Sequence, residues 1–461
     1  MRGKEHSLTI VDPSSVTKLW PSCLVAALLY AMAIFGCKEE IVPEPYVPSS
    51  AHDAYALALR QIQLDQTALG SDWLAAASNA LDEAVVVATP FTETLFVDRS
   101  MAFAVGYRFH VARGQRMEAR VEMNESHSFR MFMDLFRMAE ETDADPTHVA
   151  SGAEDELRLV FEPRRDGEYV LRLQAELLRG GTCSVVIRKV ASLEFPVAGR
   201  DTKSILSGFG EPRDAGRRKH HGVDIFARRH TPVVATSPAY VRRVTDWKLG
   251  GRVVWLHDRA RSLHIYYAHL ETQQAVEGTW VEPGDLIGTV GNSGNARTTS
   301  PHLHFGIYVR GQGPLDPYPF IHQPKQTPER VSVELDTLGS WARTIVEDVM
   351  FWSVPDHRAQ PLTDLERHTP LWVWAGTRSM YRVTLPDGLS GYVEAREVES
   401  LYAPLKRESV STEQRILDQP SGTASVMERI SPGEEVRVLG QYGEYLYVET
   451  ASGRVGWLPL D

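Results

Sequence analysis

Cysteine is scarce in this chain, with three residues among 461. Cys23 lies in an apolar N-terminal run and Cys37 follows that run, so Cys183 is left without a disulfide partner. Cys183 alternates with Val185 and Ile187, which predicts that its side chain faces a sheet core. Nothing nearby in the sequence would lower the pKa of this thiol, so a catalytic cysteine is not expected here.

Excess positive charge is also absent, because the formal net charge is −11. Such a chain has no global attraction to nucleic acid, and the basic run at residues 216–221 is too short to create one. We therefore expect no nucleic-acid partner. Hydrophobic residues make up 43% and charged residues 24%, as in ordinary globular proteins, and the length indicates three or more domains.

Long apolar runs are lacking except near the N-terminus, where Leu24–Phe35 reads LVAALLYAMAIF. Three basic residues precede this run, and its length is typical of an export signal rather than a membrane span. It ends in IFGC, which resembles a bacterial lipobox and implies lipid attachment at Cys37, although Phe35 is bulkier than usual. An uncleaved anchor over Leu19–Gly36 and cleavage to a soluble form are the alternatives.

All three alternatives export the rest of the chain. We expect a signal segment over residues 1–37, a Pro-rich acidic linker over 38–50, and a location in the cell envelope. The membrane anchor, by lipid or by an uncleaved segment, would face the periplasm or the cell exterior.

The remaining sequence predicts a mainly β, multidomain protein. Residues 51–89 form a short helical segment, with one helix over Ala51–Leu69 stopped by Gly70 and a second capped by Ser71. Residues 90–197 alternate as strands do and predict a β-sandwich, which resembles the jelly-roll domains that precede secreted bacterial peptidases. Residues 198–325 alternate glycines with short β runs and predict an antiparallel β domain.

An internal repeat occupies the C-terminal part at an offset of 65 residues. Gly388 and Tyr392 of the first copy correspond to Gly453 and Trp457 of the second. Each copy has several short strands with tight turns, so residues 330–400 and 401–461 are expected to form two small β-barrels. They resemble bacterial SH3-like domains, which often bind cell-wall peptide. The alternative is two structural appendages without a ligand.

Histidine is concentrated in the third domain, where nine of the sixteen lie between His220 and His322. His220 and Asp224 are four residues apart, and Gly222 between them permits a close backbone approach. His302 and His304 are two apart in a strand-like run, so they share a face of the sheet.

His269 lies on another strand-like run. We expect it to share a face with Ile265 and Tyr267. A buried histidine on an apolar face needs a partner, which a metal site would supply. Taken together, these histidines and Asp224 predict a metal site, and a catalytic zinc needs three protein ligands with one open position.

The segments around these residues resemble the lysostaphin-type (LytM-like) zinc metallo-endopeptidase family. The matching motifs are HxxxD in KHHGVD, a histidine in YAHL, and HxH in PHLHF, in the family's order and spacing. The resemblance implies one zinc ion (Zn2+) held by His220, Asp224 and His304. It also implies that His269 and His302 are catalytic residues beside the metal-bound water, without deciding which is the base.

Five other histidines have no partner in these motifs and are expected to be structural or exposed: His221, His230, His257, His264 and His322. The loop GNSGNARTT before HLH is longer and more polar than is common in the family, so the shape of the groove is expected to differ.

The resemblance implies an exported zinc peptidase that cuts peptide bonds in peptidoglycan. Three alternatives are a catalytically inactive LytM-like regulator of cell-wall amidases, a wall-binding scaffold, and a secreted protease that acts on Gly-rich chains. A further hypothesis is that the domains before residue 198 block the catalytic groove until they are displaced.

Overall fold

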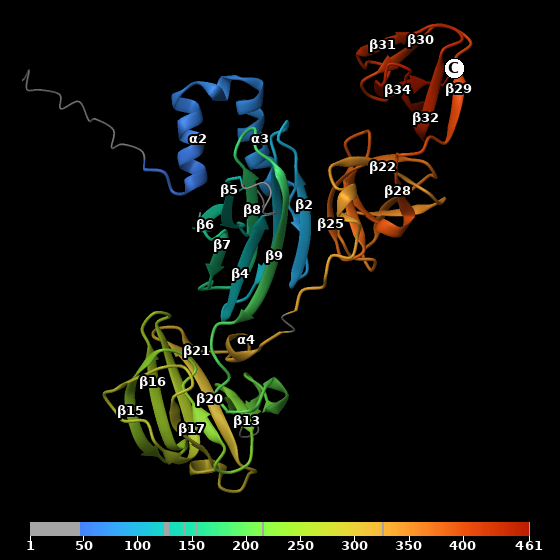
Figure 1. The fold of residues 1–461 in the computed structure, drawn as a ribbon. Helices are drawn as coiled ribbons and strands as arrows, with labels where there is room; N and C mark the ends of the chain where they lie inside the picture. The colour runs from blue at the N-terminus through green and yellow to red at the C-terminus, as the bar shows by residue number, and fades with distance from the viewer. Residues whose placement is uncertain are drawn as a thin grey trace, which may run out of the picture. The chain divides into compact units, whose positions relative to one another are not determined.

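The computed structural model describes residues 47–123, 129–141, 144–153, 155–213, 216–324 and 327–460. The predicted export signal, Cys37 and most of the linker lie outside these ranges. Within them, the chain is mainly β and carries few helices (Figure 1). None of the described helices is long and apolar enough to cross a membrane.

Two helices precede the first strand, and both differ from the prediction. Helix α2 spans Ala51–Gln61 and helix α3 spans Ala68–Asp82. The hydroxyl of Thr67, not of Ser71, caps α3 by accepting a hydrogen bond from the Gly70 amide at 3.2 Å. Gly70 therefore lies in the first turn of α3 instead of ending a helix. Only a glycine fits at this point, since an added Cβ would lie 2.0 Å from the Leu64 carbonyl oxygen.

The helices pack on strand β8 (Gly167–Ala175) through a buried polar chain. The indole nitrogen of Trp73 donates to the Ala175 carbonyl at 2.8 Å, and the Gln174 amide donates to the Trp73 carbonyl at 2.7 Å. The amide oxygen of Gln174 then accepts from His52 Nε2 at 2.6 Å. One face of β8 thus holds the helices while the other faces the sandwich core.

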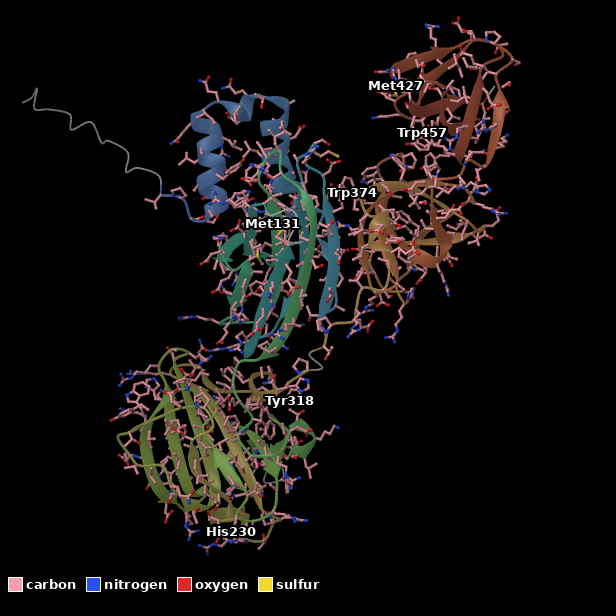
Figure 2. The ribbon with its side chains drawn as sticks, viewed as in Figure 1. Met131, His230, Tyr318, Trp374, Met427 and Trp457 are labelled. Carbon is pink, nitrogen blue, oxygen red and sulfur yellow. The ribbon has the colours of Figure 1, made fainter. Side chains whose placement is uncertain are left out.

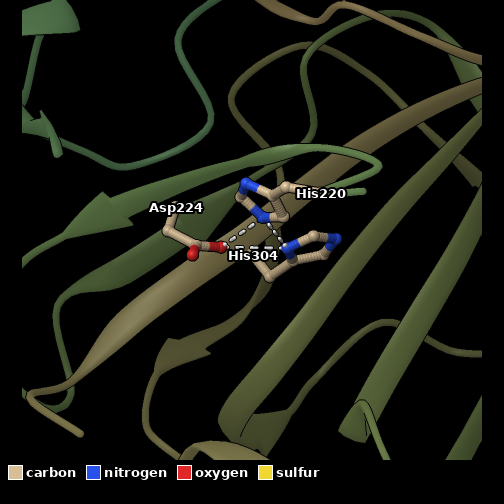
Figure 3. Close-up of side chains that lie close together, drawn as sticks. All are labelled: His220, Asp224 and His304. Carbon is tan, nitrogen blue, oxygen red and sulfur yellow. Dashed lines mark hydrogen bonds and ion pairs between the residues drawn. The ribbon is translucent and has the colours of Figure 1, made fainter. Parts of the chain in front are cut away.

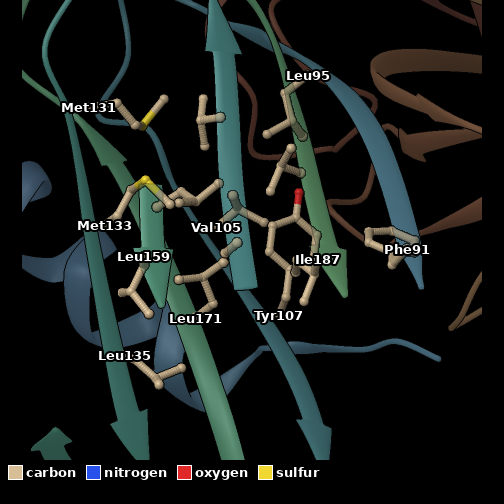
Figure 4. Packing of buried hydrophobic residues seen from close by; sticks show 14 of the residues in the cluster. Phe91, Leu95, Val105, Tyr107, Met131, Met133, Leu135, Leu159, Leu171 and Ile187 are labelled. Carbon is tan, nitrogen blue, oxygen red and sulfur yellow. The ribbon is translucent and has the colours of Figure 1, made fainter. Parts of the chain in front are cut away.

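The sandwich consists of two sheets with apolar side chains between them (Figure 4). One sheet has the order β1 (Val85–Val86), β3 (Ala104–Val111), β8, β5 (Met131–Arg137), β6 (Thr147–Ser151). The other includes β2 (Phe91–Val97), β9 (Gly181–Ala191), β4 (Gln115–Met123) and β7 (Arg158–Phe161). Cys183 lies in this core, and burial raises the pKa of its thiol to about 12, which confirms the predicted core position.

The histidine-rich domain is a ten-stranded sheet that encloses its own core. Its main strands are β10 (Ile205–Ser207), β13 (Val223–Phe226), β20 (His302–Val309), β17 (Leu263–Gln273), β16 (Gly251–Asp258), β15 (Ala239–Trp247) and β18 (Trp280–Val281), with β14 (Pro232–Val234), β19 (Leu286–Val290) and β21 (Gly313–Leu315) alongside. The core begins at Leu193, whose amide donates to the Phe320 carbonyl at 2.9 Å. Packing therefore starts upstream of residue 198.

The internal repeat is confirmed strand by strand. Pro370 and Glu435 open β25 (Pro370–Thr377) and β32 (Glu435–Tyr442), and Thr377 and Tyr442 close them, an offset of 65 at both ends. The same offset relates β23 (Val349–Trp352) to β30 (Gln414–Leu417), β24 (Pro361–Leu365) to β31 (Val426–Ile430), β26 (Met380–Thr384) to β33 (Tyr445–Glu449), and β27 (Ser390–Glu394) to β34 (Val455–Pro459).

The two copies do not form the closed barrels that the sequence led us to expect. The second copy is an open sheet in the order β29 (Lys406–Ser409), β32, β33, β34, β30, β31. In the first copy, β25 also pairs with β2 of the sandwich, which places both in one eleven-stranded sheet. Neither sheet closes among the described residues because the end strands do not pair with each other. The SH3-like resemblance stays a prediction.

Candidate metal centre

Strands β13 and β20 place two of the predicted ligands opposite each other. The strands are antiparallel, with Asp224 paired to His304. Val223, Leu303 and Phe305 point into the core. Because side chains alternate along a strand, Asp224 and His304 point to the other face. His220 reaches the same point from the loop before β13, and Figure 3 shows the three side chains converging.

Three donor atoms form a small triangle in this cluster. His220 Nε2 lies 3.0 Å from Asp224 Oδ1 and 3.0 Å from His304 Nδ1, and His304 Nδ1 lies 2.9 Å from Asp224 Oδ1. A zinc ion with bonds of about 2.0–2.1 Å in tetrahedral geometry would hold such atoms about 3.3 Å apart. The two nitrogens and one oxygen therefore fit a zinc ion after a movement of a few tenths of an ångström.

Neighbouring groups orient His220 and Asp224. His220 Nδ1 lies 2.7 Å from the Gly208 carbonyl, which can only accept, so Nδ1 carries the hydrogen and Nε2 is directed at the cluster. Arg213 donates to Asp224 Oδ2 at 2.9 Å and leaves Oδ1 for the cluster. Burial alone would raise the pKa of Asp224, but the close contacts of its carboxylate with the His220 and His304 rings outweigh burial and lower that pKa well below its usual range.

Gly222 makes the close approach that the sequence predicts. A Cβ at this position would lie 2.4 Å from the Phe305 carbonyl oxygen and 2.8 Å from Cε1 of His304. The backbone between His220 and Asp224 therefore passes directly against a third candidate ligand. A larger residue would displace either the strand or the imidazole ring.

His269 lies on the site face of the sheet, and the prediction that it shares a face with Ile265 and Tyr267 is wrong. Tyr267 pairs with Val254, but Leu270 pairs with Arg252, so β17 carries one residue more than β16 at this point. This bulge places His269 at φ +62°. Ile265 and Tyr267 stay in the core, whereas the His269 ring lies 5.1 Å from that of His302.

Both flanking histidines have one ring nitrogen fixed by a backbone carbonyl. His269 Nδ1 lies 2.9 Å from the Ser293 carbonyl, and His302 Nδ1 lies 2.9 Å from the Ser300 carbonyl. Since a carbonyl only accepts, each Nδ1 carries the hydrogen, and in the neutral form of either ring Nε2 has a lone pair. Burial, followed by the nearby His304 and His302, lowers the pKa of His269 to about 4, so it is neutral near pH 7.

The other histidines do not join the cluster. His221 is exposed, and His230 is exposed on the loop between β13 and β14 (Figure 2). His257 and His264 stack on each other with ring centroids 4.7 Å apart, and His322 stacks on Tyr318 at 4.8 Å. Among the described residues, His220, Asp224 and His304 form the one group whose donor atoms lie close enough together to hold a metal ion.

Sequence reasoning missed an aromatic group on the same face as His304. Tyr266 stands edge-on to the His304 ring at 5.9 Å, and it packs against Trp255 at 4.5 Å. Trp255 in turn contacts Tyr308 at 5.3 Å. Alternation along β20 would have found Tyr308 once the face of His304 was fixed. Arg213 carries no comparable signal, because it lies in the two-residue strand β11 (Pro212–Arg213), whose approach to the cluster follows from tertiary contacts.

The sequence of this domain has known relatives. Residues 218–317 match the profile described as Peptidase family M23. An L-Ala–D-Glu endopeptidase of Bacillus subtilis (strain 168) is 37% identical over 138 residues, which are 28% of this chain and 42% of the relative. A peptidoglycan DD-endopeptidase of Vibrio cholerae is 31% identical over 127 residues, 27% of this chain and 28% of the relative. The chain thus spans less than half the length of these curated relatives.

Solved structures also resemble part of the chain. The catalytic domain of lysostaphin from Staphylococcus simulans has 31% sequence identity and covers 24% of this chain and 87% of that chain, with a TM-score of 0.23. A zinc-containing peptidase from Vibrio cholerae has 25% identity and covers 30% of this chain and 42% of that chain, with a TM-score of 0.25.

Proposed function

We propose that this protein, whose residues 218–317 match peptidase family M23, is an exported zinc metallo-endopeptidase that hydrolyses peptide bonds in peptidoglycan. The bonds would lie in the stem peptides or the cross-links. The observation that carries the proposal is the triangle of His220, Asp224 and His304 donor atoms, flanked by two further histidines whose tautomers are fixed. The names of the relatives, which are endopeptidases, support the same reaction class.

His220, Asp224 and His304 would hold the zinc ion. When bound, the ion supplies a Lewis acid that polarises the scissile carbonyl and lowers the pKa of a coordinated water. The carbonyl of Gly208 and the guanidinium of Arg213 hold His220 and Asp224 in place, so little conformational entropy is lost when the ion binds.

His269 and His302 would move the proton of the attacking water. Each presents an Nε2 lone pair, because its Nδ1 hydrogen is bonded to a carbonyl. The imidazole that takes the proton then carries an Nε2–H. That group can stabilise the oxyanion of the tetrahedral intermediate, and it can return the proton to the departing amine.

The cell envelope is the proposed location. The apolar run and the lipobox-like Cys37 support export and lipid anchoring, and the linker after Cys37 would let the enzyme reach the wall. The two C-terminal repeats would bind wall peptide. The complete donor set favours an enzyme over an inactive regulator or a scaffold, since such proteins have no need to retain three ligands and two flanking histidines.

Mass spectrometry of peptides released from purified sacculi tests the proposal. The wild-type chain should release peptides with new amino termini, and the terminal residue identifies the bond. A chelator should stop release, and added zinc should restore it. An elastin-like Gly-rich substrate provides the comparison for a general secreted protease. No release by a chain that holds one equivalent of zinc would contradict the proposal.

Adjacent histidines give a matched pair of variants. His220→Ala should lose both zinc and activity, because it removes one donor of the triangle. His221→Ala should keep both, because His221 is exposed outside the cluster. If His221→Ala strips the metal while His220→Ala retains it, the ligand assignment is wrong.

A further inference from the structure

A cavity of about 710 Å³ lies in the first C-terminal repeat and shares no residue with the metal centre. Strand β23 forms one wall. Asp348, Met350 and Trp352 line the cavity, while Val349 and Phe351 between them are buried in the core of the repeat. Val349 to Trp352 therefore alternate as in a strand with one face in the core, and Asp348 joins the lining from the residue just before the strand. The volume falls within the range of roughly 300–1,000 Å³ that is usual for ligand pockets.

Strand β27 contributes a buried carboxylate to the lining of the cavity. Glu394 is 7% exposed, and its Oε1 lies 2.9 Å from Nε2 of His357 on the loop after β23. The His357 ring stands edge-on to Trp352, with centroids 5.4 Å apart and planes at 86°. Trp352 and Glu394 therefore lie at the same end of the cavity, and His357 connects them.

The second repeat shows that the fold does not require these three side chains. The positions 65 residues later carry Leu417, Gly422 and Pro459 in place of Trp352, His357 and Glu394. The second copy nevertheless has β30 and β34 at the same offsets as β23 and β27. Trp352, His357 and Glu394 are therefore available for a role other than holding the sheet together.

The charges of the lining indicate the chemistry of an occupant. Asp348, Glu394 and Glu397 place three carboxylates around the cavity, against one guanidinium from Arg396 that is 80% exposed. Asp348 makes no ion pair or hydrogen bond in the described structure and has φ +53°, a strained conformation that is frequent at functional sites. The side chains of Trp352 and Met350 add an aromatic face and a flexible apolar wall.

An aliphatic stem that ends in an ammonium group matches this lining. The stem would lie against Met350 and Trp352, and the ammonium would meet Asp348 and Glu394. An anion would be repelled by the three carboxylates. A purely apolar group would leave Asp348 desolvated without a partner, whereas Glu394 keeps His357 and Glu397 keeps Arg396.

We propose that the cavity binds the ammonium-bearing side chain of a diamino acid within a peptide. By binding this side chain, the cavity holds a stem peptide of peptidoglycan on the first C-terminal repeat. The identity of the peptide rests on the proposed function, whereas the preference for an amine does not.

Titration of the full chain with Nα-acetyl-lysine methylamide, followed by NMR, tests the amine preference. The matched probe is Nα-acetyl-norleucine methylamide, which has a similar stem without the ammonium. We expect the lysine probe to bind at least tenfold more tightly, and more weakly as salt rises. Equal affinity of the two probes, or no binding of either, would overturn the inference.

Three variants locate the binding. Asp348→Asn and Glu394→Gln remove one charge each with little change of shape, so the ratio of the two affinities should fall towards one. Trp352→Leu installs the residue that the second repeat carries and should weaken both probes. Asp336→Asn, an exposed carboxylate on the same repeat that does not line the cavity, should leave both affinities unchanged.

The His220→Ala background separates this inference from the proposed function. Binding of the lysine probe should be the same in His220→Ala as in wild type, because the cavity shares no residue with the metal centre. If wild type releases no wall peptide but still prefers the lysine probe, the peptidase proposal fails and the amine site stands. If it cleaves the wall but shows no preference between probes, the amine site fails alone.

Discussion

At the scale of single residues, Gly222 provides the sharpest test of the site. Gly222→Ala forces a Cβ to within 2.4 Å of the Phe305 carbonyl and 2.8 Å of the His304 ring. Displacing a ligand or its support typically costs 10–100-fold in metal affinity, so we expect a decrease of about that size. Competition with a fluorescent zinc chelator measures it. Gly422→Ala, where a Cβ meets nothing within 4 Å, should bind zinc as wild type does.

The two flanking histidines should separate catalysis from metal binding. His269→Ala and His302→Ala leave the three donor atoms in place, so each variant should still hold one zinc ion. Each should lose roughly 10²–10⁴-fold in kcat, the usual contribution of a proton-transfer group. Metal content by atomic emission, measured on the samples used for kinetics, checks the prediction. Loss of zinc in either variant would instead make that residue a ligand.

Much of this site could be predicted from residue spacing. Period two along a strand placed His302 and His304 on one face, and the structure has them there. The same rule failed for His269, because a bulge inserts one residue between Tyr267 and Leu270. Arg213 and the Gly208 and Ser293 carbonyls were not predicted, since their contacts depend on segments that only the fold brings together.

At the scale of elements, helix α2 carries a buried histidine that makes its packing sensitive to acid. Burial and the nearby Arg172 lower the pKa of His52 to about 4, from about 6.5 in the unfolded chain. The unfolded chain therefore binds more protons between these values, and stability is lost as pH falls through that window. From pH 7 to pH 5 we expect a loss of about 2 kcal/mol.

His52→Gln removes this titration while keeping a donor for Gln174. Its stability should depend less on pH than that of wild type, whatever its absolute value. Hydrogen exchange across α2 and α3 at pH 7 and pH 5 measures the difference. Parallel changes in the two proteins would show that another group is responsible.

The positions of elements were predicted unevenly. The offset of 65 residues predicted the strand positions of the repeats correctly, because the same pattern occurs in both copies. The boundary of α3 was missed because Thr67 and Ser71 are both good caps, and only the contact of Gly70 with the preceding turn selects Thr67. Barrel closure was wrongly expected because strand length and turns do not specify which edge strands pair.

At the scale of the whole molecule, the sandwich and the first repeat share a continuous sheet. Thr94 and Leu95 of β2 pair with Gly376 and Ala375 of β25. Glu93 on the same strand is fully buried and accepts hydrogen bonds from Tyr107 at 2.6 Å and from Tyr392 of the repeat at 3.2 Å. The repeat therefore supplies a pairing strand for β2 and a hydrogen-bond donor for the buried Glu93 of the sandwich.

Truncation should reveal this dependence. A chain that ends at residue 324 loses β25 and Tyr392, which exposes the edge of β2 and removes a partner of a buried carboxylate. We expect a lower melting temperature for the sandwich, with a loss of about 1–3 kcal/mol, and a tendency to aggregate. A chain that ends at residue 401 lacks only the second repeat and should keep the wild-type melting temperature of the sandwich. Equal behaviour of the two truncations would contradict the shared sheet.

Inhibition by the N-terminal domains stays a prediction at this scale. A peptidase that begins near residue 192 retains Leu193, with which the core of the domain starts. If the preceding domains block the groove, this fragment should cleave a soluble stem peptide faster than the full chain does. Equal rates in a continuous cleavage assay would rule the block out.

The bulge in β17 limits which sequence changes the site can tolerate. Substitutions near His269 alter one side chain, but deletion of a single residue between Tyr267 and Leu270 would make the strand regular. Deletion of Ala268 would leave the histidine directly after Tyr267 in a regular strand. Alternation would still put it on the site face, but it would lose the bulge and the φ of +62° that set its present position. Insertions and deletions at this point are therefore more damaging than replacements, and the number of residues there is as much a requirement of the site as their identity.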